Sequence, residues 1–513
     1  TIPTKSRDIS YAGCGLPYYV GGLIEDRGEL IVNTPQSFSR LTGAKVRTGI
    51  EVTALDRAAK TVTAKNLDDG STETLSYDKL VITTGAEPFK PNLPGIDLPG
   101  VFCMRTPDDA IGLRDQIEAG TLKRAVVVGG GFIGLEVAEN LSAQGVRVTV
   151  VEMAPHILPM FDGEIAEYLE NHLADQGIMT FTGDRVEEIL GGGKVEKVKT
   201  SRRAFKADAV IMAAGIRPAT GFLKDTGIEL MPNGTVKVDA QMRTNDPDIY
   251  AAGDCVTVTN RITGQPAWSP MGSSANIEGR LLARHMTGSD VSYPGVLGTG
   301  VIRLPAINAG RTGLTEAEAT AAGFDAVSVL AAVDDKAHYY PDASSFIIKL
   351  VADRQSRRLL GLQVLGKGAV DKVVDIAVMA ISMNATLDQL ENLDLAYAPP
   401  FSTAIHPFSN AVNVLQNKLS GALESMTPAQ YLAGEAEGYT VLDFCKAPLI
   451  TGAEYLAPGD INGPLEGHPL DEKLLLVCNR GRRAYMAQNR LKFYGYRNTR
   501  VLEGGMAFNQ VTV

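Results

Sequence analysis

The sequence has few cysteines, and none of them lies in a spacing typical of a metal or dithiol site. The five cysteines of this 513-residue chain are scattered and form no C-x-x-C pattern. We therefore expect no secreted disulfide framework and no bound metal. Dispersed cysteines in a large acidic protein suit a reducing compartment, which predicts a cytoplasmic protein. The five are Cys14, Cys103, Cys255, Cys445 and Cys478.

The chain also lacks a long apolar run and a block of like charge. No stretch approaches the roughly 20 apolar residues that cross a bilayer, and no basic segment leads into an apolar one at the amino terminus. The 49 basic and 59 acidic residues give a net charge of -10 and are interspersed. We therefore expect neither a membrane nor a nucleic acid as a partner. The length and the 44% apolar content predict several packed domains.

The clearest motif that is present is a strand, a glycine-rich turn and a helix. An apolar run, 125–128, precedes the turn 129–134, and a helical stretch, 135–144, follows it. Such a turn lets the backbone approach a pyrophosphate, which the start of the helix then binds. A second strand, 147–151, ends in Glu152, whose carboxylate can accept hydrogen bonds from a ribose and would repel a 2'-phosphate. The motif predicts NADH, with NADPH as the alternative, bound by Gly129, Gly131, Phe132, Ile133, Gly134 and Glu152.

Segments on either side of this motif repeat a strand that runs into a turn of small residues. Residues 77–85 and 209–215 share this pattern, and the strand 249–254 ends in glycine and an acid. The repetition suggests two related nucleotide-binding folds, one interrupting the other.

Two further blocks follow in the sequence. The first contains candidate strands at 345–351 and 359–366 and a candidate helix at 370–383. After a predicted linker, 419–426, the terminal segment alternates strands with helices, which predicts a small α/β domain.

Three motifs in order resemble the flavin disulfide reductase superfamily. They are 10–19, which reads SYAGCGLPYY, the turn 129–134, and 249–254. The Cys-Gly-Leu-Pro-Tyr core is similar to the single-cysteine branch that contains coenzyme A disulfide reductases and polysulfide reductases. The resemblance covers about residues 6–420. It implies an α/β protein with two Rossmann-like nucleotide-binding domains, for FAD and NADH, and an α+β dimerisation domain.

Cys14 is the predicted redox sulfur. Members with a redox dithiol carry a second cysteine five positions later, where this chain has Tyr19. A lone cysteine can cycle instead between a thiolate, a mixed disulfide and a sulfenic acid. The resemblance implies that NADH reduces the flavin, that the flavin reduces the sulfur at Cys14, and that the thiolate attacks a small disulfide or polysulfide. Taken alone, a single cysteine is more often inert packing, and the surrounding motif favours the redox role.

The resemblance assigns further residues to the site. In this branch two tyrosines of the partner subunit approach the cysteine, and Tyr339 and Tyr397 match them, which implies a homodimer. A phenol there can donate a proton to a departing thiolate, although a half-buried interface aromatic is the alternative. We treat His338 and His406 as structural. The expected cofactor contacts beyond the glycine turn are Thr84, Gly85, Gly215, Gly253 and Asp254.

The terminal segment resembles a rhodanese module. Cys478 follows a strand and opens a loop whose N–H groups and arginines can hold an anionic persulfide, which makes Cys478 a persulfide carrier. Rhodaneses usually have an arginine two residues after the acid that matches Asp443, and this chain has Cys445 there. An inert regulatory domain is therefore the alternative. The rest of the expected loop is Asn479, Arg480, Gly481, Arg482 and Arg483.

The resemblance also predicts the domain boundaries. A flavoprotein of this kind should open with a strand, a glycine turn and a helix, and the first residues, with Thr4 where a ribose-binding acid would stand, do not supply them. We expect the native start to precede Thr1, the alternative being weak or no flavin binding. The expected domains are FAD-binding, 1–120 and 231–297 without the first βαβ unit; NADH-binding, 121–230; dimerisation, 298–420; and rhodanese-like, 427–513.

The leading functional hypothesis is NADH-dependent reduction of coenzyme A disulfide, persulfide or polysulfide. Coenzyme A is the expected substrate or ligand, although Gly13 stands where these reductases often have an asparagine. The main rival is an NADH oxidase or peroxidase that works through a sulfenic acid on Cys14. A sulfur carrier or redox sensor that binds nucleotide without turnover is the third hypothesis.

Overall fold

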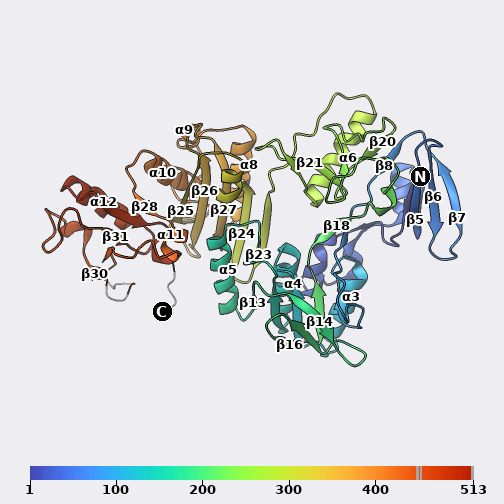
Figure 1. Cartoon of the computed structure of the whole chain (residues 1–513), viewed down its shortest axis with the longest axis horizontal. Coiled ribbons are helices and arrows are strands. Elements are labelled where there is room, and N and C mark those ends of the chain that lie inside the picture. Colours follow the sequence, from blue (N-terminus) through green and yellow to red (C-terminus); the bar gives the residue numbers. More distant parts are fainter. Residues whose placement is uncertain (446–449, 451–452, 510–513) are drawn as a thin grey trace. The chain divides into compact units, whose positions relative to one another are not determined.

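The computed structural model describes residues 1–445, 450 and 453–509, and the chain forms two compact units (Figure 1). Unit 1 comprises Thr1–Pro159 and Glu170–Val296, and unit 2 comprises Met160–Leu169 and Leu297–Val513. A short segment of unit 2 therefore interrupts the sequence of unit 1.

A parallel five-stranded sheet of unit 1 carries the predicted nicotinamide motif. Its strand order is β10-β17-β11-β12-β13. The side chains of β11 after its first residue are buried on both faces, as expected for a parallel sheet covered by helices. Helix α4 starts three residues before the predicted 135–144, because Gly131 is its N-cap. The elements are β10 Val101–Phe102, α3 Pro107–Glu118, β11 Arg124–Val128, α4 Phe132–Ala143, β12 Arg147–Val151, α5 Gly163–Asp175, β13 Met179–Phe181 and β17 Ala209–Met212, with an antiparallel sheet of β14 Val186–Leu190, β15 Lys197–Thr200 and β16 Ala204–Lys206.

The region predicted to bind FAD differs from one continuous Rossmann sheet. Its strands form separate small sheets, because hairpins and short pairs occupy the sequence around the parallel pair β8-β20. The described elements are β1 Ile2–Thr4, β2 Ser10–Tyr11, α1 Leu16–Val20, β3 Ile31–Asn33, α2 Pro35–Thr42, β4 Val46–Thr48, β5 Ile50–Asp56, β6 Thr61–Asn66, β7 Thr72–Ser76, β8 Leu80–Ile82, β9 Ala86–Pro88, β18 Ile216–Pro218, β19 Val236–Lys237, β20 Ile249–Ala251, β21 Val256–Thr259, β22 Pro266–Ala267 and α6 Gly272–Met286.

Unit 2 contains an antiparallel sheet with strand order β23-β24-β27-β26-β25. Helix α8 packs on β24 and β27, and α10 packs on β25 and β26. The predicted strand 359–366 is confirmed, and the predicted strand 345–351 extends two residues further. The elements are β23 Gly300–Leu304, β24 Ile307–Gly313, α7 Glu316–Ala321, β25 Ala326–Asp334, β26 Ser345–Asp353, β27 Leu359–Gly366, α8 Val370–Ser382, α9 Leu387–Leu390 and α10 Pro407–Leu419.

A second sheet of unit 2 is parallel, with strand order β28-β32-β31-β29-β30 (Figure 1). The predicted linker 419–426 is wrong at its far end, because Ser425–Met426 pairs with β32 and is the edge strand β28. The elements are β28 Ser425–Met426, α11 Pro428–Leu432, β29 Thr440–Asp443, β30 Glu454–Tyr455, β31 Leu474–Val477, α12 Arg482–Phe493 and β32 Thr499–Leu502.

Candidate active site

The glycine-rich turn after β11 can be built only from glycines at two of its positions. Gly129 has φ +112°, and a Cβ there would lie 2.2 Å from the carbonyl oxygen of Ala213. A Cβ on Gly134 would lie 2.0 Å from the carbonyl oxygen of Gly129. These glycines therefore allow close contact between the turn, helix α4 and the end of β17.

Gly131 leaves open space at the start of α4. It is the N-cap of the helix, no side chain caps it, and a Cβ there would have no atom within 4 Å. Phe132 and Ile133 begin the helix, and Ile133 is exposed. The first N–H groups of a helix lack partners within it, so this turn fits the phosphates of a dinucleotide.

Glu152 holds the turn from the end of the neighbouring strand β12. Its Oε2 accepts a hydrogen bond from the N–H of Gly130 at 2.7 Å, and its Oε1 accepts one from the N–H of Ala154 at 2.7 Å. Gly215, with φ +108°, follows β17 on the other side of β11, and a Cβ there would also meet no atom within 4 Å. The predicted nicotinamide residues thus gather at one edge of the sheet.

A second strand edge brings together the residues matched to the flavin. β8 and β20 are parallel, so Thr84 and Gly85 follow one strand while Gly253 and Asp254 follow the other at the same edge. Both glycines have positive φ, +68° and +85°. Burial raises the pKa of Asp254, and the guanidinium of Arg105 opposes that shift. This backbone, with an acid and a cation beside it, fits part of a second dinucleotide site.

Cys14 is exposed and lies in a single 3-10 turn, Gly13–Gly15. The hydroxyl of Tyr11 donates a hydrogen bond to the carbonyl oxygen of Arg105 at 3.3 Å, so the cysteine segment is joined to the strand edge that carries Asp254. Tyr19, five residues after the cysteine, is buried beneath the guanidinium of Arg114, 4.5 Å from its ring centroid. The thiol is therefore accessible, and the position of a resolving cysteine is filled by a packed aromatic ring.

The cysteine segment packs along helix α4. A Cβ on Gly21 would lie 2.1 Å from Oδ1 of Asn140, and Nε2 of Gln144 donates to the carbonyl oxygen of Gly21 at 2.6 Å. Positions 136, 140 and 144 share one face of a helix because they are four residues apart. Glu136 therefore lies on the face that meets α1, one turn nearer the glycine-rich turn.

Glu136 was not predicted from the sequence. Burial first, and then the neighbouring Glu139, raises its pKa to about 7. A buried carboxyl that titrates near neutral pH, on the helix that follows the glycine-rich turn, is a candidate for handling protons. The available signal was a carboxylate two residues after the glycine motif, within a helix that has mostly buried apolar residues.

Glu136→Gln should stabilise the protein at pH 8 and have little effect at pH 4. The folded-state pKa of about 7 lies above the 4.5 that is usual for a glutamate. Wild-type stability therefore falls as pH rises from about 4.5 to 7, where the unfolded chain binds fewer protons. The neutral amide avoids that loss, which corresponds to roughly 2–3 kcal/mol. Thermal unfolding midpoints across this pH range measure the gap. Glu437→Gln, at an exposed carboxyl, is the control, and an equal gap at pH 4 and pH 8 would contradict the assignment.

The predicted tyrosine pair is brought together in unit 2. A hydrogen bond between the hydroxyls of Tyr339 and Tyr397 raises the pKa of Tyr339. Both rings are at least half exposed. His406, by contrast, is buried, and its Nδ1 accepts a hydrogen bond from the N–H of Phe408 at the start of α10. Burial first, and then Lys372, lowers the pKa of His406 to about 4, so it is a neutral helix cap at physiological pH.

The predicted persulfide loop connects β31 with α12. Cys478 is only 2% exposed, and its carbonyl oxygen accepts a hydrogen bond from the N–H of Met506 at 3.0 Å. Arg480 forms an ion pair with Asp334 of β25. Asn479 and Arg482 are exposed, Gly481 caps α12 with φ +82°, and Nη1 of Arg483 lies 3.4 Å from the carbonyl oxygen of Phe444. The loop is therefore fixed by contacts on several sides.

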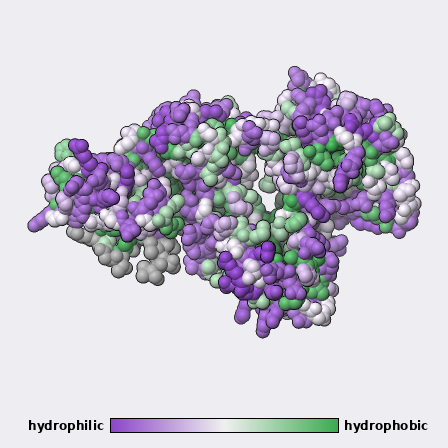
Figure 2. Space-filling view, viewed as in Figure 1, coloured by the Kyte–Doolittle hydropathy of each residue, from purple (hydrophilic) through white to green (hydrophobic). Residues whose placement is uncertain are grey.

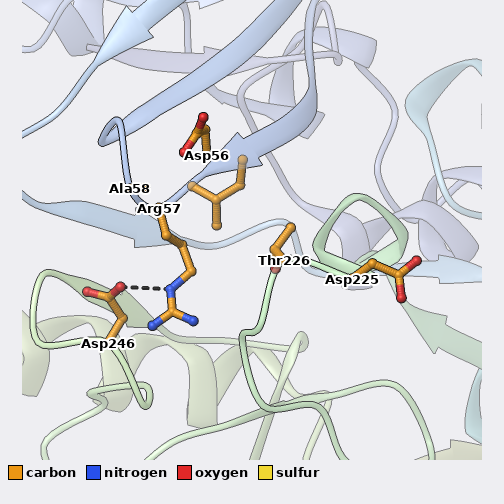
Figure 3. A pocket seen from close by; sticks show the side chains of 7 residues that line it. Asp56, Arg57, Ala58, Asp225, Thr226 and Asp246 are labelled. Carbon is orange, nitrogen blue, oxygen red and sulfur yellow. Dashed lines mark hydrogen bonds and ion pairs between the residues drawn. The ribbon is translucent and has the colours of Figure 1, made fainter.

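A surface hollow in unit 1 is lined by none of the predicted site residues (Figure 3). Arg57 donates from Nε to Oδ2 of Asp246 and from Nη1 to the carbonyl oxygen of Gly227, both at 2.8 Å. These hydrogen bonds pair the guanidinium of Arg57 with groups of the protein itself. Its lining residues are Leu55, Asp56, Arg57, Ala58, Asp225, Thr226 and Asp246.

Within residues 1–445, 450 and 453–509, no helix is both long and apolar enough to cross a membrane. The same residues contain no group of three or more histidine, cysteine or carboxylate side chains arranged to hold a metal. Figure 2 shows hydrophilic residues over much of the visible face of each unit.

Two family profiles match the chain. The profile of the pyridine nucleotide-disulphide oxidoreductases matches residues 2–272, which carry the cysteine segment and both strand edges, and that of their dimerisation domain matches residues 305–407. The chain belongs to the pyridine nucleotide-disulphide oxidoreductase family. It is therefore an oxidoreductase that depends on FAD and NAD(P)H, with a mixed α/β fold and a dimerisation domain.

Relatives within this family have related but distinct names. An NADH oxidase of Methanocaldococcus jannaschii is 35% identical over 82% of this chain and 93% of its own length. A CoA-dependent NAD(P)H sulfur oxidoreductase of Pyrococcus abyssi is 34% identical over 80% of this chain and 90% of its own.

Solved structures extend the likeness to the terminal sheet. The structure of an NAD-dependent persulfide reductase from A. fulgidus is 36% identical, with a TM-score of 0.93, and covers 99% of this chain and 95% of its own. Reduced Bacillus anthracis CoADR-RHD is 31% identical, with the same TM-score, and covers 99% of this chain and 92% of its own. The family fold and the terminal sheet therefore occur together in both structures.

Proposed function

We propose that this oxidoreductase uses NADH to reduce coenzyme A disulfide, persulfides or polysulfides, with Cys14 as its redox sulfur. The observation that carries the proposal is that the thiol of Cys14 is accessible. The position five residues later, where a resolving cysteine would lie, holds the buried Tyr19 instead. Relatives named as sulfur oxidoreductases, polysulfide/persulfide reductases and coenzyme A disulfide reductases support the substrate class.

The chemistry follows from which residues hold the cofactors. The turn 129–134 with Glu152 would hold the nicotinamide dinucleotide, and Thr84, Gly85, Gly253 and Asp254 would contact the flavin. Bound there, FAD would supply two-electron reduction of sulfur at the disulfide level, with NADH as the electron donor. The Cys14 thiolate attacks one sulfur of the substrate, forms a mixed disulfide, and releases the other sulfur as a thiolate.

The tyrosine pair supplies the proton for that departing sulfur. The hydrogen bond between Tyr339 and Tyr397 orients one phenol toward the other, and their exposure leaves them free to meet a partner chain. In the proposed homodimer this pair completes the site of the partner chain. A monomer with full activity would contradict this part of the proposal.

The terminal α/β domain would transfer sulfane sulfur through Cys478 as a rhodanese. Its support is a cysteine at the end of a buried strand, a fixed loop with three arginines, and the full-length likeness to a persulfide reductase. The expected product is a persulfide on Cys478.

A second candidate is an NADH oxidase, in which the Cys14 sulfur is oxidised to a sulfenic acid. The exposed Cys14 thiol, which has no resolving cysteine at position 19, permits that chemistry. Relatives from M. jannaschii and Enterococcus faecalis are named NADH oxidases. Membership in an enzyme family gives no support to the non-turnover scaffold. Steady-state NADH consumption with polysulfide, coenzyme A disulfide, oxygen and peroxide separates the two candidates. A faster rate with oxygen than with either sulfur substrate would favour the oxidase.

Glu152→Ala should raise the KM for NADH about tenfold, which corresponds to about 1.4 kcal/mol of binding free energy. The variant should also discriminate less between NADH and NADPH. The carboxylate would otherwise bind the ribose and also hold the N–H of Gly130. Initial rates with the two nucleotides measure both effects. Glu188→Ala is the control, because Glu188 lies outside this sheet edge, and it should leave both KM values unchanged. An unaltered NADH KM in the Glu152 variant would remove the ribose contact.

A further inference from the structure

Cys445 and Cys478 reach the same edge of the terminal sheet. β29 and β31 are parallel neighbours, and Asp443 at the end of one is in register with Val477 at the end of the other. The N–H of Phe444 then donates to the carbonyl oxygen of Val477 at 2.8 Å, so pairing continues past the strand ends. The two cysteines therefore follow adjacent strands within one residue of register.

The two thiols share one buried environment. Cys445 is 8% exposed and Cys478 is 2% exposed, and both belong to the same apolar cluster. The N–H of Asn479, the residue after Cys478, donates a hydrogen bond to the sulfur of Cys445. Neighbouring strands lie about 4.8 Å apart, and one residue of stagger adds about 3.3 Å along the strand, which gives a Cα separation of about 6 Å. Disulfides span Cα separations of about 4.4–6.8 Å, so a bond between the two cysteines needs little backbone movement.

The surroundings of Cys445 keep its proton in place. Burial is the main cause that raises its pKa, and the carboxylate of Asp443 and the sulfur of Cys478 act in the same direction. Asp443 is fully buried, and its Oδ1 accepts a hydrogen bond from the N–H of Cys445 at 2.8 Å. Cys445 is thus a protonated thiol, held against the persulfide loop, at neutral pH.

We propose that Cys445 is the resolving cysteine for a persulfide formed on Cys478. The proposal rests on the proposed sulfur transfer by Cys478 and adds a second redox pair to the chain, separate from Cys14. Cys445 occupies the position where the rhodanese resemblance implies an arginine, so a thiol replaces a group that would only bind the anion.

Inorganic polysulfide supplies both the transferred sulfur atom and the two oxidising equivalents of the reaction. The Cys478 thiolate first takes one sulfur atom from an inorganic polysulfide, which leaves one sulfur shorter, and Cys478 becomes a persulfide anion. The thiol of Cys445 passes its proton to the outer sulfur of the persulfide, and the resulting Cys445 thiolate attacks the sulfur of Cys478. The bond to the outer sulfur breaks, that sulfur leaves with the electron pair and the proton of Cys445 as hydrosulfide, and a Cys445–Cys478 disulfide forms.

A small thiol completes the cycle. Two equivalents of a low-molecular-weight thiol reduce the Cys445–Cys478 disulfide by exchange and emerge as their own disulfide. That product is the class of substrate assigned above to Cys14, so NADH would supply the electrons for the second pair through a diffusing thiol. The enclosure of Cys478 favours an adjacent thiol over a bulky external one as the first attacking group.

The test uses the full chain with Cys14→Ser as background, so that Cys14 contributes no sulfur chemistry. Reduced protein is mixed with a small excess of inorganic tetrasulfide without NADH or thiol. Released sulfide is measured in this mixture, and the protein is then desalted and analysed by intact and peptide mass spectrometry. From the stoichiometry of the exchange, we expect about one hydrosulfide per chain in addition to the shortened polysulfide. We also expect a pair of peptides joined by a disulfide between Cys445 and Cys478. The linked peptide is measured in a chain that retains both cysteines, so it does not depend on the folding of a variant.

Adding Cys445→Ser should abolish the linked peptide and leave a persulfide on Cys478. This persulfide is detected as one added sulfur atom that cyanide removes. Adding Cys103→Ser instead should change neither readout. A persulfide that persists equally with and without Cys445 would overturn the resolving role while leaving sulfur transfer intact. If Cys478 takes up no sulfur even in the Cys445→Ser chain, sulfur transfer itself fails and the resolving role fails with it.

Discussion

Replacing Cys14 with serine should lower the rate of NADH-dependent polysulfide reduction by at least about 100-fold. Serine keeps the size of the side chain in the exposed 3-10 turn but cannot form a mixed disulfide or persulfide. Its neighbours Tyr11 and Tyr19 make their contacts through Arg105 and Arg114, so the fold of the segment should survive. NADH consumption with tetrasulfide or coenzyme A disulfide measures the loss.

Cys103→Ser is the matched control, because Cys103 is a half-buried cysteine of the same unit with no predicted role. It should leave the rate unchanged. NADH should still bleach the flavin absorbance of the Cys14→Ser holoenzyme, which shows that the nucleotide sites are intact. Full polysulfide activity in that variant would overturn the proposed mechanism, whereas loss of bleaching would place the defect in cofactor binding.

Local signals in the sequence predicted the nicotinamide part of the molecule well. Two glycines are required by backbone clashes, and a strand-end acid is required to hold the turn, so Gly129, Gly134 and Glu152 leave a fixed spacing in the chain. The predicted strand 147–151 is therefore confirmed to the residue, whereas the helix starts three residues earlier and ends one residue earlier than predicted.

Features that depend on long-range contacts left no comparable signal. Glu136 has a pKa of about 7 mainly because it is buried in the folded chain. Its helix packs against α1, where Gly21, more than a hundred residues earlier in the sequence, lies against Asn140. The pairing of Cys445 with Cys478 depends on which strands of the terminal sheet are neighbours, which spacing alone does not give. The sequence marked Cys445 only as a departure from an expected arginine.

The buried Lys349 shows the same limit in the core of unit 2. It lies in the middle of β26, a strand whose other inner residues are apolar, and it is 4% exposed. Its Nζ lies 2.5 Å from Glu164, 3.0 Å from Asp162 and 3.1 Å from Glu316. Burial works to lower the pKa of Lys349, but the three carboxylates outweigh it and hold the pKa above its usual value. One cation therefore pairs with three acids from two distant parts of the sequence.

Lys349→Met should destabilise the protein by about 3–5 kcal/mol, because it leaves buried carboxylates without their cation. Chemical denaturation monitored by far-UV circular dichroism measures the loss of stability. Arg354→Met is the matched control, since Arg354 follows the same strand and forms an exposed ion pair with Asp325. It should leave the midpoint nearly unchanged, because exposed pairs contribute little.

A triple variant identifies the cause of the Lys349 effect. If unpaired charge is responsible, adding Asp162→Asn and Glu164→Gln to Lys349→Met should recover part of the lost stability, since neutral amides no longer need the cation. The hydrogen bonds between Gln363 and Asp162 provide a neutral partner for the new amide. A triple variant as unstable as the single one would show that the lysine acts through packing of its aliphatic chain rather than through its charge.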